Sequence, residues 1–416
     1  MGNSIKNEAI IVGLDVGTTK ILCLVADYDD ENQLRIIGIG DTPCDGLEKG
    51  VISEIQTTVS SIRRAVSIAR STSGHAVESV TTGIAGSHIQ CFSGNAAINI
   101  VNDEVTEEDK DTVVQNAQNI QIPNDQEVLH VIPQFYTIDG QVGIREPIGM
   151  AGARLEVSVH IITSSSTAKK NLTKCIENSL LDIDHFVLEP VASSYSVLSE
   201  EERSLGVCLV DIGGGTTDVA IFTDGTIKHT AVIPIAGQMI TNDIKIGLRT
   251  STDAAEEIKI QHGSLINQPD DEEKIIPIPS ISDKPDAEIR KTGLSHIISC
   301  RIDEIFEKIK NEIENSGHSN QIRAGIVFTG GGARISGLDE YAEAKFSCPA
   351  RIGAPAAIKG IGNVSGKTRY STAVGLLLYR ASKLKGMVDG TKSDNPLFLS
   401  LQRFWAKLST YFQKEL

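Results

Sequence analysis

The sequence predicts an α/β protein of more than one domain whose core is present twice. The first observation is residues 207–222, VCLVDIGGGTTDVAIF, where an apolar run ends in Asp211, a glycine-rich turn follows, and a second apolar run leaves. The second is residues 10–25, IIVGLDVGTTKILCLV, which repeat the arrangement around Asp15. The third is the length of 416 residues, which exceeds one ordinary core and suggests two or three units. Two similar strand–turn–strand segments in one chain indicate duplication.

Both turns have the composition of a phosphate-binding site. Glycines allow a ligand to approach the backbone closely, and threonine hydroxyls and turn amides can bond phosphate oxygens. An aspartate at the end of a strand suits Mg²⁺. Either turn alone could be an ordinary glycine hairpin, but the pair favours a site for a metal-bound nucleotide.

Composition limits the partners and the compartment. The net charge is −15 and the isoelectric point is about 5.1, which argues against a nucleic-acid-binding surface because that surface must be basic. The seven cysteines are scattered and never in a CxxC spacing, which favours free thiols in a reducing cytosol. Because no signal-peptide pattern and no apolar run of ~18 residues occurs, we expect neither secretion nor a membrane-spanning helix.

The first 85 residues predict three strands followed by a helix. The strands are AIIVGLD, TKILCLVADY and QLRIIGIG, the last two separated by the polar turn DDEN. Apolar residues then recur every three or four positions from Ile55 to Ala69, which is typical of a helix with one buried face.

Residues 86–160 differ in residue pattern from the segments on either side and predict an inserted subdomain. Short strands such as AAINIV and EVLHVIPQFYTI surround the charged stretch TEEDKDTVVQNAQNI, where Thr106 is the expected N-cap of a helix and Asp109 its partner. The strand and helix pattern of the first domain then continues with the strand VSVHIIT, a helix over 167–181 and the strand FVLE. After the insertion the chain therefore re-enters the first domain.

The second half predicts the same order of elements. A third strand, TIKHTAVIPI, follows the hairpin; two helices over 240–250 and 252–263 precede an acidic, proline-rich loop. A helix from about Glu288 carries isoleucines on one face. Residues 325–338, GIVFTGGGARISGL, predict a strand that enters three glycines and then a helix start, and the folded body is expected to end near Ala381.

The last 35 residues predict a flexible linker over 382–396 and an amphipathic helix over 397–416. At 100° per residue one apolar arc forms, flanked by cations. The arc contains Leu401, Phe404, Trp405, Leu408, Tyr411 and Phe412, and the cations are Arg403, Lys407 and Lys414. This pattern describes a helix that lies in a membrane interface; the alternative is a last helix docked on the protein's own core.

Two other motifs fail on spacing or context. Residues 360–368, GIGNVSGKT, end like a Walker A loop, but Ile361 occupies the position of the required glycine. The turn DIGGGTTD leads into a strand rather than the helix that a dinucleotide fingerprint requires.

Together these motifs resemble the actin-like ATPase superfamily, and within it the FtsA family of bacterial cell-division proteins. The segments that carry the closer resemblance, in order over about residues 9–380, are GLDVGTTK, GSHI, VIPQ, IGMAGARLEVSVHIIT, LEPVASSY, VDIGGGTTDVAIF, HTAVIPIAG, ITNDI and FTGGGARISGL. The glycine turns alone indicate only the superfamily.

The resemblance implies an actin-like, ribonuclease H-like duplicated fold with four subdomains around a nucleotide cleft. The implied subdomains are IA (1–85, 161–205 and about 368–381), the inserted IC (86–160), IIA (206–235 and 300–367) and IIB (236–299), followed by the linker (382–396) and the membrane-targeting helix (397–416).

The resemblance also implies residue roles. Asp15 and Asp211 would hold Mg²⁺ through water molecules, and Glu189 would orient the attacking water, although a solvated carboxylate at a strand end is the alternative for Glu189. Phosphate contacts would come from Gly17, Thr18, Thr19, Lys20, Gly213, Gly214, Gly215, Thr216 and Thr217. Glu256 and Lys259 would contact the ribose and adenine, or else form an exposed helix pair; Gly330, Gly331 and Gly332 would close the adenosine side. Residues 236–238, AGQ, depart from the family pattern.

The implied function is that of an ATP-binding protein, at most a weak ATPase, which polymerises at the membrane and anchors FtsZ filaments there. The expected partners are the FtsZ C-terminal tail, other copies of the chain, other divisome proteins and an anionic membrane surface, with ATP and Mg²⁺ as cofactors. Arg290, Lys291 and Arg301 are candidate contacts for the acidic FtsZ tail, although surface cations usually face solvent. The alternative is a cytosolic actin-fold kinase or a pilus-assembly-type ATPase.

Overall fold

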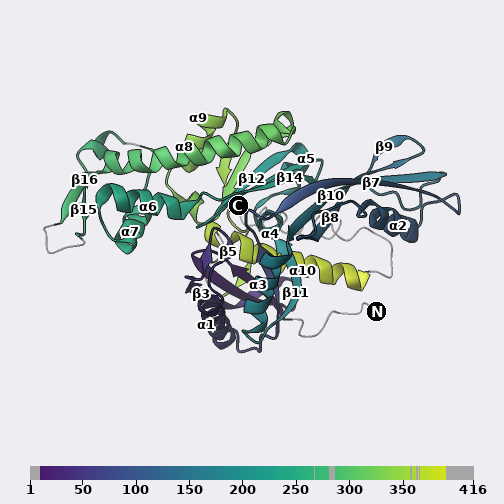
Figure 1. The fold of residues 1–416 in the computed structure, drawn as a ribbon, viewed down its shortest axis with the longest axis horizontal. Coiled ribbons are helices and arrows are strands. Elements are labelled where there is room, and N and C mark those ends of the chain that lie inside the picture. Colours follow the sequence, from purple (N-terminus) through teal and green to yellow (C-terminus); the bar gives the residue numbers. More distant parts are fainter. Residues whose placement is uncertain are drawn as a thin grey trace.

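The computed structural model of the protein is an elongated molecule with two β-sheets, each covered by helices, at its centre (Figure 1). It describes residues 10–266, 268–280, 286–356, 358–361, 364 and 366–389. The predicted amphipathic helix at 397–416 lies outside these residues and stays a prediction. No helix in the described ranges is long and apolar enough to cross a bilayer.

The first sheet has the strand order β11-β6-β1-β2-β3-β19. Strands β1, β2 and β3 form the predicted antiparallel meander, while β6 and β11 run parallel to β1. The strands are β1 (Ile11–Val16), β2 (Lys20–Tyr28), β3 (Leu34–Pro43), β6 (Ser79–Ile84), β11 (Asp182–Leu188) and β19 (Lys359–Gly360). A small ribbon, β4 (Leu47–Glu48) and β5 (Val51–Ile52), lies between β3 and the first helix.

The second sheet repeats this topology in the order β14-β13-β12-β17-β18. Again three antiparallel strands are followed by two parallel ones. The strands are β12 (Val207–Ile212), β13 (Thr217–Thr223), β14 (Thr226–Ile233), β17 (Ile326–Thr329) and β18 (Ala350–Ile352). The predicted duplication is therefore confirmed at the level of strand order and direction.

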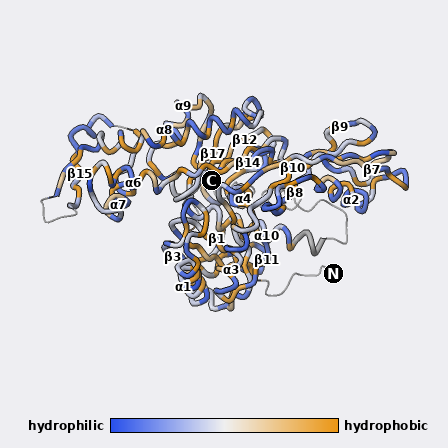
Figure 2. Tube along the Cα trace, viewed as in Figure 1, coloured by the Kyte–Doolittle hydropathy of each residue, from blue (hydrophilic) through white to orange (hydrophobic). Residues whose placement is uncertain are grey.

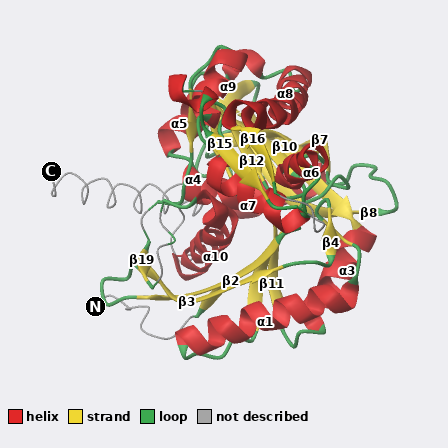
Figure 3. Cartoon of the chain, turned by 90° about the vertical axis from the view of Figure 1, so that its left-hand side faces the viewer, coloured by secondary structure: helices red, strands yellow, loops and turns green. Residues whose placement is uncertain are grey.

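Helices cover both sheets. α1 (Ile55–Ser73), the predicted amphipathic helix, lies on one face of the first sheet, and α10 (Ser371–Asp389) lies on the other (Figure 3). Beside them are α3 (Ser166–Glu177), α4 (Glu189–Val197) and the short α5 (Glu200–Leu205). The hydrophobic segments gather where β1, β12 and β17 lie (Figure 2), and one core joins both sheets through α4 and α10.

α4 and α10 cross in close contact between the two halves of the molecule. A Cβ atom added at Gly375 would lie 1.9 Å from the carbonyl oxygen of Ala192, so only glycine fits at this crossing. The small residues of the segment STAVG allow this approach. α10 continues to Asp389, so the first eight residues of the expected linker are helical instead.

The segment predicted to be inserted forms its own four-stranded sheet, in the order β7-β10-β8-β9, at one end of the molecule (Figure 1). Its elements are β7 (Gln90–Asn99), α2 (Glu107–Ala117), β8 (Gln126–Ile138), β9 (Gln141–Ile144) and β10 (Arg154–Ser165). Thr106 caps α2, and the backbone N–H of Thr106 donates to the Asp109 carboxylate over 3.0 Å, as predicted. A separate core of isoleucine and valine side chains holds this unit together.

The inserted sheet also contacts the second sheet. Gln134 of β8 donates to the carbonyl oxygen of Ile227 over 3.0 Å, and the Cys91 Sγ and Thr230 Oγ1 atoms are 2.7 Å apart. On the other side, the backbone N–H of Leu188 donates to Nε2 of His130 over 3.0 Å. β8 therefore contacts both halves of the molecule.

His160 predicts a pH dependence of stability at this junction. It is buried in β10, and burial, with nearby His229 and Lys228, lowers its pKa from 6.5 to about 4. As the pH falls, the unfolded chain therefore protonates His160 at a higher pH than the folded chain does, and stability that is present above pH 6.5 is lost as the pH falls toward 4. We expect this difference to lower the free energy of unfolding by about 2 kcal/mol between pH 7 and pH 5.

Urea unfolding of wild type and His160→Gln at both pH values measures this effect. The pH slope should be shallower in the variant, whereas His75→Gln, at an exposed site, should keep the wild-type slope. Equal slopes in wild type and His160→Gln would contradict the assignment.

The opposite end of the molecule is built from helices and a two-stranded ribbon (Figure 1). Its elements are α6 (Gly237–Leu248), α7 (Thr252–His262), the 3₁₀ turn Pro269–Glu272, β15 (Ile275–Ile278), β16 (Ala287–Arg290) and α8 (Lys291–Asn315). The long helix was expected from about Glu288, but 287–290 pair with β15 instead and the helix begins at Lys291. α8 buries its predicted isoleucine face from Ile298 to Ile313.

The glycine segment after β17 differs in detail from the prediction. A 3₁₀ turn, Gly332–Arg334, begins at the third glycine, and α9 (Leu338–Phe346) begins only after Gly337. Two further 3₁₀ turns, Ser319–Gln321 and Thr368–Tyr370, precede β17 and α10.

Candidate functional site

The two predicted turns have the same internal hydrogen bond. In the first, the N–H of Gly17 donates to the carbonyl oxygen of Lys20 over 3.0 Å; in the second, the N–H of Gly213 donates to that of Thr216 over 2.9 Å. Each turn joins the first two strands of its sheet, so the duplication extends to the backbone of the site.

The turns face each other across the boundary between the halves. A Cβ atom added at Gly214 would lie 2.4 Å from a Thr19 methyl carbon, and one added at Gly215 would lie 2.4 Å from Thr18 Oγ1. The glycines therefore permit a contact that side chains would block. The structure brings together the residues that were predicted to bind phosphate.

Three buried aspartates lie behind the turns. Asp15 is the next-to-last residue of β1 and is 3% exposed. Asp211 lies in β12 and is 6% exposed, and Asp218 lies opposite Asp211 in β13 and is 2% exposed. Asp218 was missed as a site residue, although an aspartate directly after two threonines in an apolar strand was a visible signal. Its Oδ1 atom is buried without a hydrogen-bond partner in the described structure.

These carboxylates share a site with little opposing charge. Burial, reinforced by Asp211, raises the pKa of Asp218 to about 8, and burial raises that of Asp211. The Nζ atom of Lys20 lies 2.6 Å from Oδ2 of Asp15 and supplies one positive charge. Carboxylates that are costly to ionise together are suited to a divalent cation. Among the described residues, no three acidic, imidazole or thiol groups form a direct metal-ligand set.

Glu189 begins α4 directly after β11 and faces the same carboxylates. Burial, with Asp15, Asp218 and Asp211, holds its pKa well above the usual value. The Glu189 side chain is half-buried, so its role in orienting a water molecule stays a prediction, beside the alternative of a solvated carboxylate at a strand end. A cavity of about 20 Å³, large enough for one water molecule, borders Glu189 and His88.

The glycine segment after β17 lies against the second turn. A Cβ atom added at Gly330, which has a φ of +88°, would lie 2.3 Å from Oδ1 of Asp211. Gly332 packs similarly against Ile212, whereas Gly331 has open space beside it. These glycines thus form a wall of the site.

Glu256 and Lys259 form an ion pair on α7, with 2.7 Å between Lys259 Nζ and Glu256 Oε2. Lys259 also donates to the carbonyl oxygen of Gly237 over 3.2 Å, and the N–H of Gly237 donates to that of Gly213 over 3.1 Å. Thr241, not singled out from the sequence, donates to Glu256. Residues 236–238, AGQ, which depart from the family pattern, still contact the second turn, because the backbone N–H groups of Gly237 and Gln238 donate to it.

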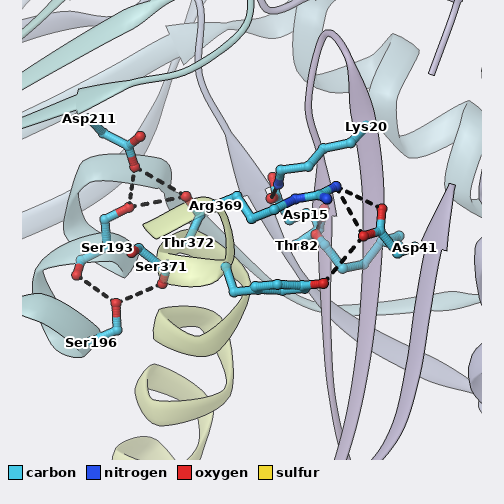
Figure 4. Close-up of polar contacts among 12 residues, drawn as sticks. Asp15, Lys20, Asp41, Thr82, Ser193, Ser196, Asp211, Arg369, Ser371 and Thr372 are labelled. Atoms are coloured by element: carbon cyan, nitrogen blue, oxygen red, sulfur yellow. Dashed lines mark hydrogen bonds and ion pairs between the residues drawn. The ribbon is translucent and has the colours of Figure 1, made fainter. Parts of the chain in front are cut away.

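A network of hydroxyl groups connects Asp211 to the crossing helices (Figure 4). Ser193 of α4 donates to Asp211 Oδ2 over 2.6 Å, and Thr372 of α10 lies 3.2 Å from the same atom. Neither residue was identified from the sequence, because 179 positions separate them. Figure 4 also shows Arg369 paired with Asp41 of β3 at 3.0 Å.

The three cations proposed as partner contacts lie on other elements than these turns: Arg290 ends β16, Lys291 begins α8, and Arg301 lies in the middle of α8. Arg301 pairs with Asp243 through two hydrogen bonds, and Lys291 lies 3.0 Å from buried Asp271. Arg290 is exposed at the end of β16. An acidic partner would have to compete with the chain's own carboxylates at Lys291 and Arg301.

Comparison with known sequences gives matches over nearly the full chain. The family model described as Cell division protein FtsA matches residues 208–375, and the model described as the SHS2 domain inserted in FtsA matches 86–163. The Cell division protein FtsA of Pseudomonas aeruginosa is 45% identical over 406 residues, covering 96% of this chain and 97% of its own. That of Escherichia coli K12 is 36% identical, covering 98% and 99%.

Solved structures of lower identity have the same fold. The PilM-PilN type IV pilus biogenesis complex aligns with a TM-score of 0.63 at 16% identity, covering 89% of this chain and 98% of the matched one. MreB5 of Spiroplasma citri bound to ADP aligns with a TM-score of 0.55 at 17% identity, covering 91% and 98%. These likenesses, with the SHS2 match, confirm the predicted actin-like fold with an inserted domain.

Proposed function

Because this chain belongs to the FtsA family of cell-division proteins, we propose that it is an ATP-binding protein that polymerises on the membrane and anchors FtsZ filaments there. The observation that carries the nucleotide part is the pair of facing glycine turns with buried aspartates behind them. Such turns offer amides and hydroxyls to phosphates and carboxylates to a hydrated Mg²⁺.

In this proposal each half of the cleft contributes one turn and one aspartate. Gly17 to Lys20 and Gly213 to Thr217 contact the phosphates, and Asp15 and Asp211 hold the hydrated cation. Mg²⁺ would neutralise the clustered carboxylates. The Oδ1 atom of Asp218, which has no hydrogen-bond partner in the described structure, would help to hold the same hydrated cation. A related actin-like protein, MreB5, has been solved with ADP and with AMPPNP, which supports ATP as the ligand class.

Turnover would be slow, with nucleotide binding favouring assembly rather than driving a rapid cycle. Glu189 would orient a water molecule, and its raised pKa lowers the fraction of this carboxyl that is ionised and able to accept a proton. Glu256 and Lys259 would contact the ribose and adenine, with Gly330 to Gly332 opposite.

At the membrane, residues 397–416 would bind the lipid interface through the apolar arc, on the cytoplasmic face at the division site. The FtsZ C-terminal tail would bind the α6–α8 end of the molecule, where Arg290 is exposed and Lys291 and Arg301 exchange their own carboxylates for those of the tail. Other divisome proteins would join this assembly. The proposed subdomains keep the boundaries expected from the sequence, except that α10 extends subdomain IA to Asp389.

An electron micrograph of the full-length protein on a lipid monolayer tests membrane binding and assembly together. With Mg·ATP we expect filaments on monolayers that contain anionic lipid, and none in the presence of EDTA. Protein that stays in the subphase under both conditions would refute the proposal.

The likeness to a pilus biogenesis complex keeps one alternative, an ATPase of pilus-assembly type, in view. An ATPase of this class, or a kinase of the same fold, would have no need for an amphipathic tail. Phosphate transfer to a small acceptor, or wild-type behaviour after removal of residues 397–416, would favour the alternative.

A further inference from the structure

The carboxylate of Asp211 is held by hydroxyl groups from outside its own sheet. Its Oδ2 atom accepts from Ser193 at 2.6 Å and lies 3.2 Å from Thr372 Oγ1; the two hydroxyl oxygens are 3.1 Å apart. Ser193 is 0% exposed and Thr372 is 9% exposed. The three residues lie on β12, α4 and α10, so the triangle joins the second sheet to both crossing helices.

The crossing helices do not need this triangle for their own packing. They already meet at Gly375 and Ala192, and Ser196, one turn after Ser193, donates to the carbonyl oxygen of Ser371 over 2.7 Å. Ser196 is as buried as Ser193 and also connects α4 to α10, but it does not contact Asp211. What distinguishes Ser193 is its carboxylate partner.

We infer that Ser193 and Thr372 are positioning residues that hold the Asp211 carboxylate in the orientation that binds the cation of Mg·ATP. The inference deepens the proposed function and rests on it. Buried beside Asp15 and Asp218, the Asp211 anion is repelled by its neighbours, and two hydroxyl donors offset part of this cost. With Oδ2 fixed in this way, Oδ1 remains on the side of Gly330.

Groups that hydrogen-bond to metal-binding carboxylates commonly change metal affinity by 10- to 100-fold when they are removed. Ser193→Ala should therefore lower the affinity for Mg·ATP roughly tenfold. It should leave the affinity for ATP in EDTA unchanged, because Ser193 acts through the cation site alone. Thr372→Val should act in the same direction, and Thr372→Ser, which retains the hydroxyl, should restore wild-type affinity.

The experiment is calorimetric titration of the full-length protein with ATP, in Mg²⁺ and in EDTA, for wild type and variants. Ser196→Ala is the matched control, since it removes an equally buried hydroxyl between the same helices, and it should bind Mg·ATP like wild type. Melting temperatures of the two alanine variants should agree within a few degrees.

Three results would overturn the inference: wild-type Mg·ATP affinity in Ser193→Ala and Thr372→Val, an equal loss in Mg²⁺ and in EDTA, or an equal loss in Ser196→Ala. The last two would assign Ser193 to helix packing. Failure of the proposed function looks different, because wild type itself would then bind ATP equally with and without Mg²⁺, or not at all.

Discussion

Replacing Asp211 with asparagine is expected to weaken Mg·ATP binding by about a hundredfold while leaving the folded protein at least as stable as wild type. The substitution keeps the shape of the side chain and removes its negative charge, which the cation requires. Without nucleotide, the same charge is a cost, because Asp211 is buried beside Asp15 and Asp218 and burial raises its pKa. Affinity and stability should therefore change in opposite directions, as is common at functional sites.

Calorimetry with Mg·ATP and thermal unfolding without ligand measure the two effects on one preparation. Asp224→Asn is a suitable control, because Asp224 occupies an exposed turn of the same sheet at a φ of +53°, which asparagine tolerates. It should alter neither quantity. Unchanged Mg·ATP affinity in Asp211→Asn would remove Asp211 from the cation site, and a fall of more than a few degrees in Tm would contradict the proposed repulsion.

Replacing Leu408 with glutamate is expected to lower liposome binding of the full-length protein by at least about a hundredfold. Leu408 is at the centre of the predicted apolar arc, so a carboxylate there opposes burial of the whole face. Apolar burial at ~25 cal/mol per Å² gives several kcal/mol to the helix, and each nearby cation adds up to ~1 kcal/mol on anionic lipid. Deletion of residues 397–416 should abolish binding, with ATP affinity retained.

Gln413→Glu provides the matched control for this tail. It adds the same charge on the opposite side of the predicted helix, so its effect should be limited to weak repulsion by anionic lipid. Co-sedimentation with vesicles that contain anionic phospholipid compares the two variants. Similar losses in both would mean that net charge, rather than an apolar face, controls binding, and full binding after deletion would exclude the tail as the anchor.

Local patterns were sufficient to predict most of the architecture. Apolar alternation around Asp15 and Asp211 predicted the two meanders, because each strand pairs with its neighbour in sequence. The spacing from Ile55 to Ala69 predicted α1, and Thr106 with Asp109 predicted the start of α2. In each case the information lies within a few residues of the element itself.

Elements that depend on distant partners were not predicted. β19 has two residues and exists only because β3 offers a free edge, and β16 forms where a helix was expected because β15 lies opposite. α10 continues past Ala381 through a segment whose mixed glycine and charge indicated a linker. Such outcomes depend on tertiary contacts that no local pattern contains.

The candidate site divides in the same way. The glycine turns, Asp15 and Asp211 follow from a repeated local motif, and the structure brings them together. Ser193 and Thr372 could not be selected, since buried serines and threonines are ordinary in helices and only the crossing of α4 and α10 gives these two a carboxylate partner.

The position of β8 has a mechanical consequence. This strand contains 13 residues, so it extends about 40 Å, and its contacts to Leu188 and Ile227 hold it near the boundary between the two halves. Both contacts lie inside the strand, at His130 and Gln134, so β8 meets the two halves at points only four residues, or about 13 Å, apart. A change in the relative position of the halves would therefore act on this short segment first. The inserted sheet would then have to move with one half or lose its hydrogen bond to the other.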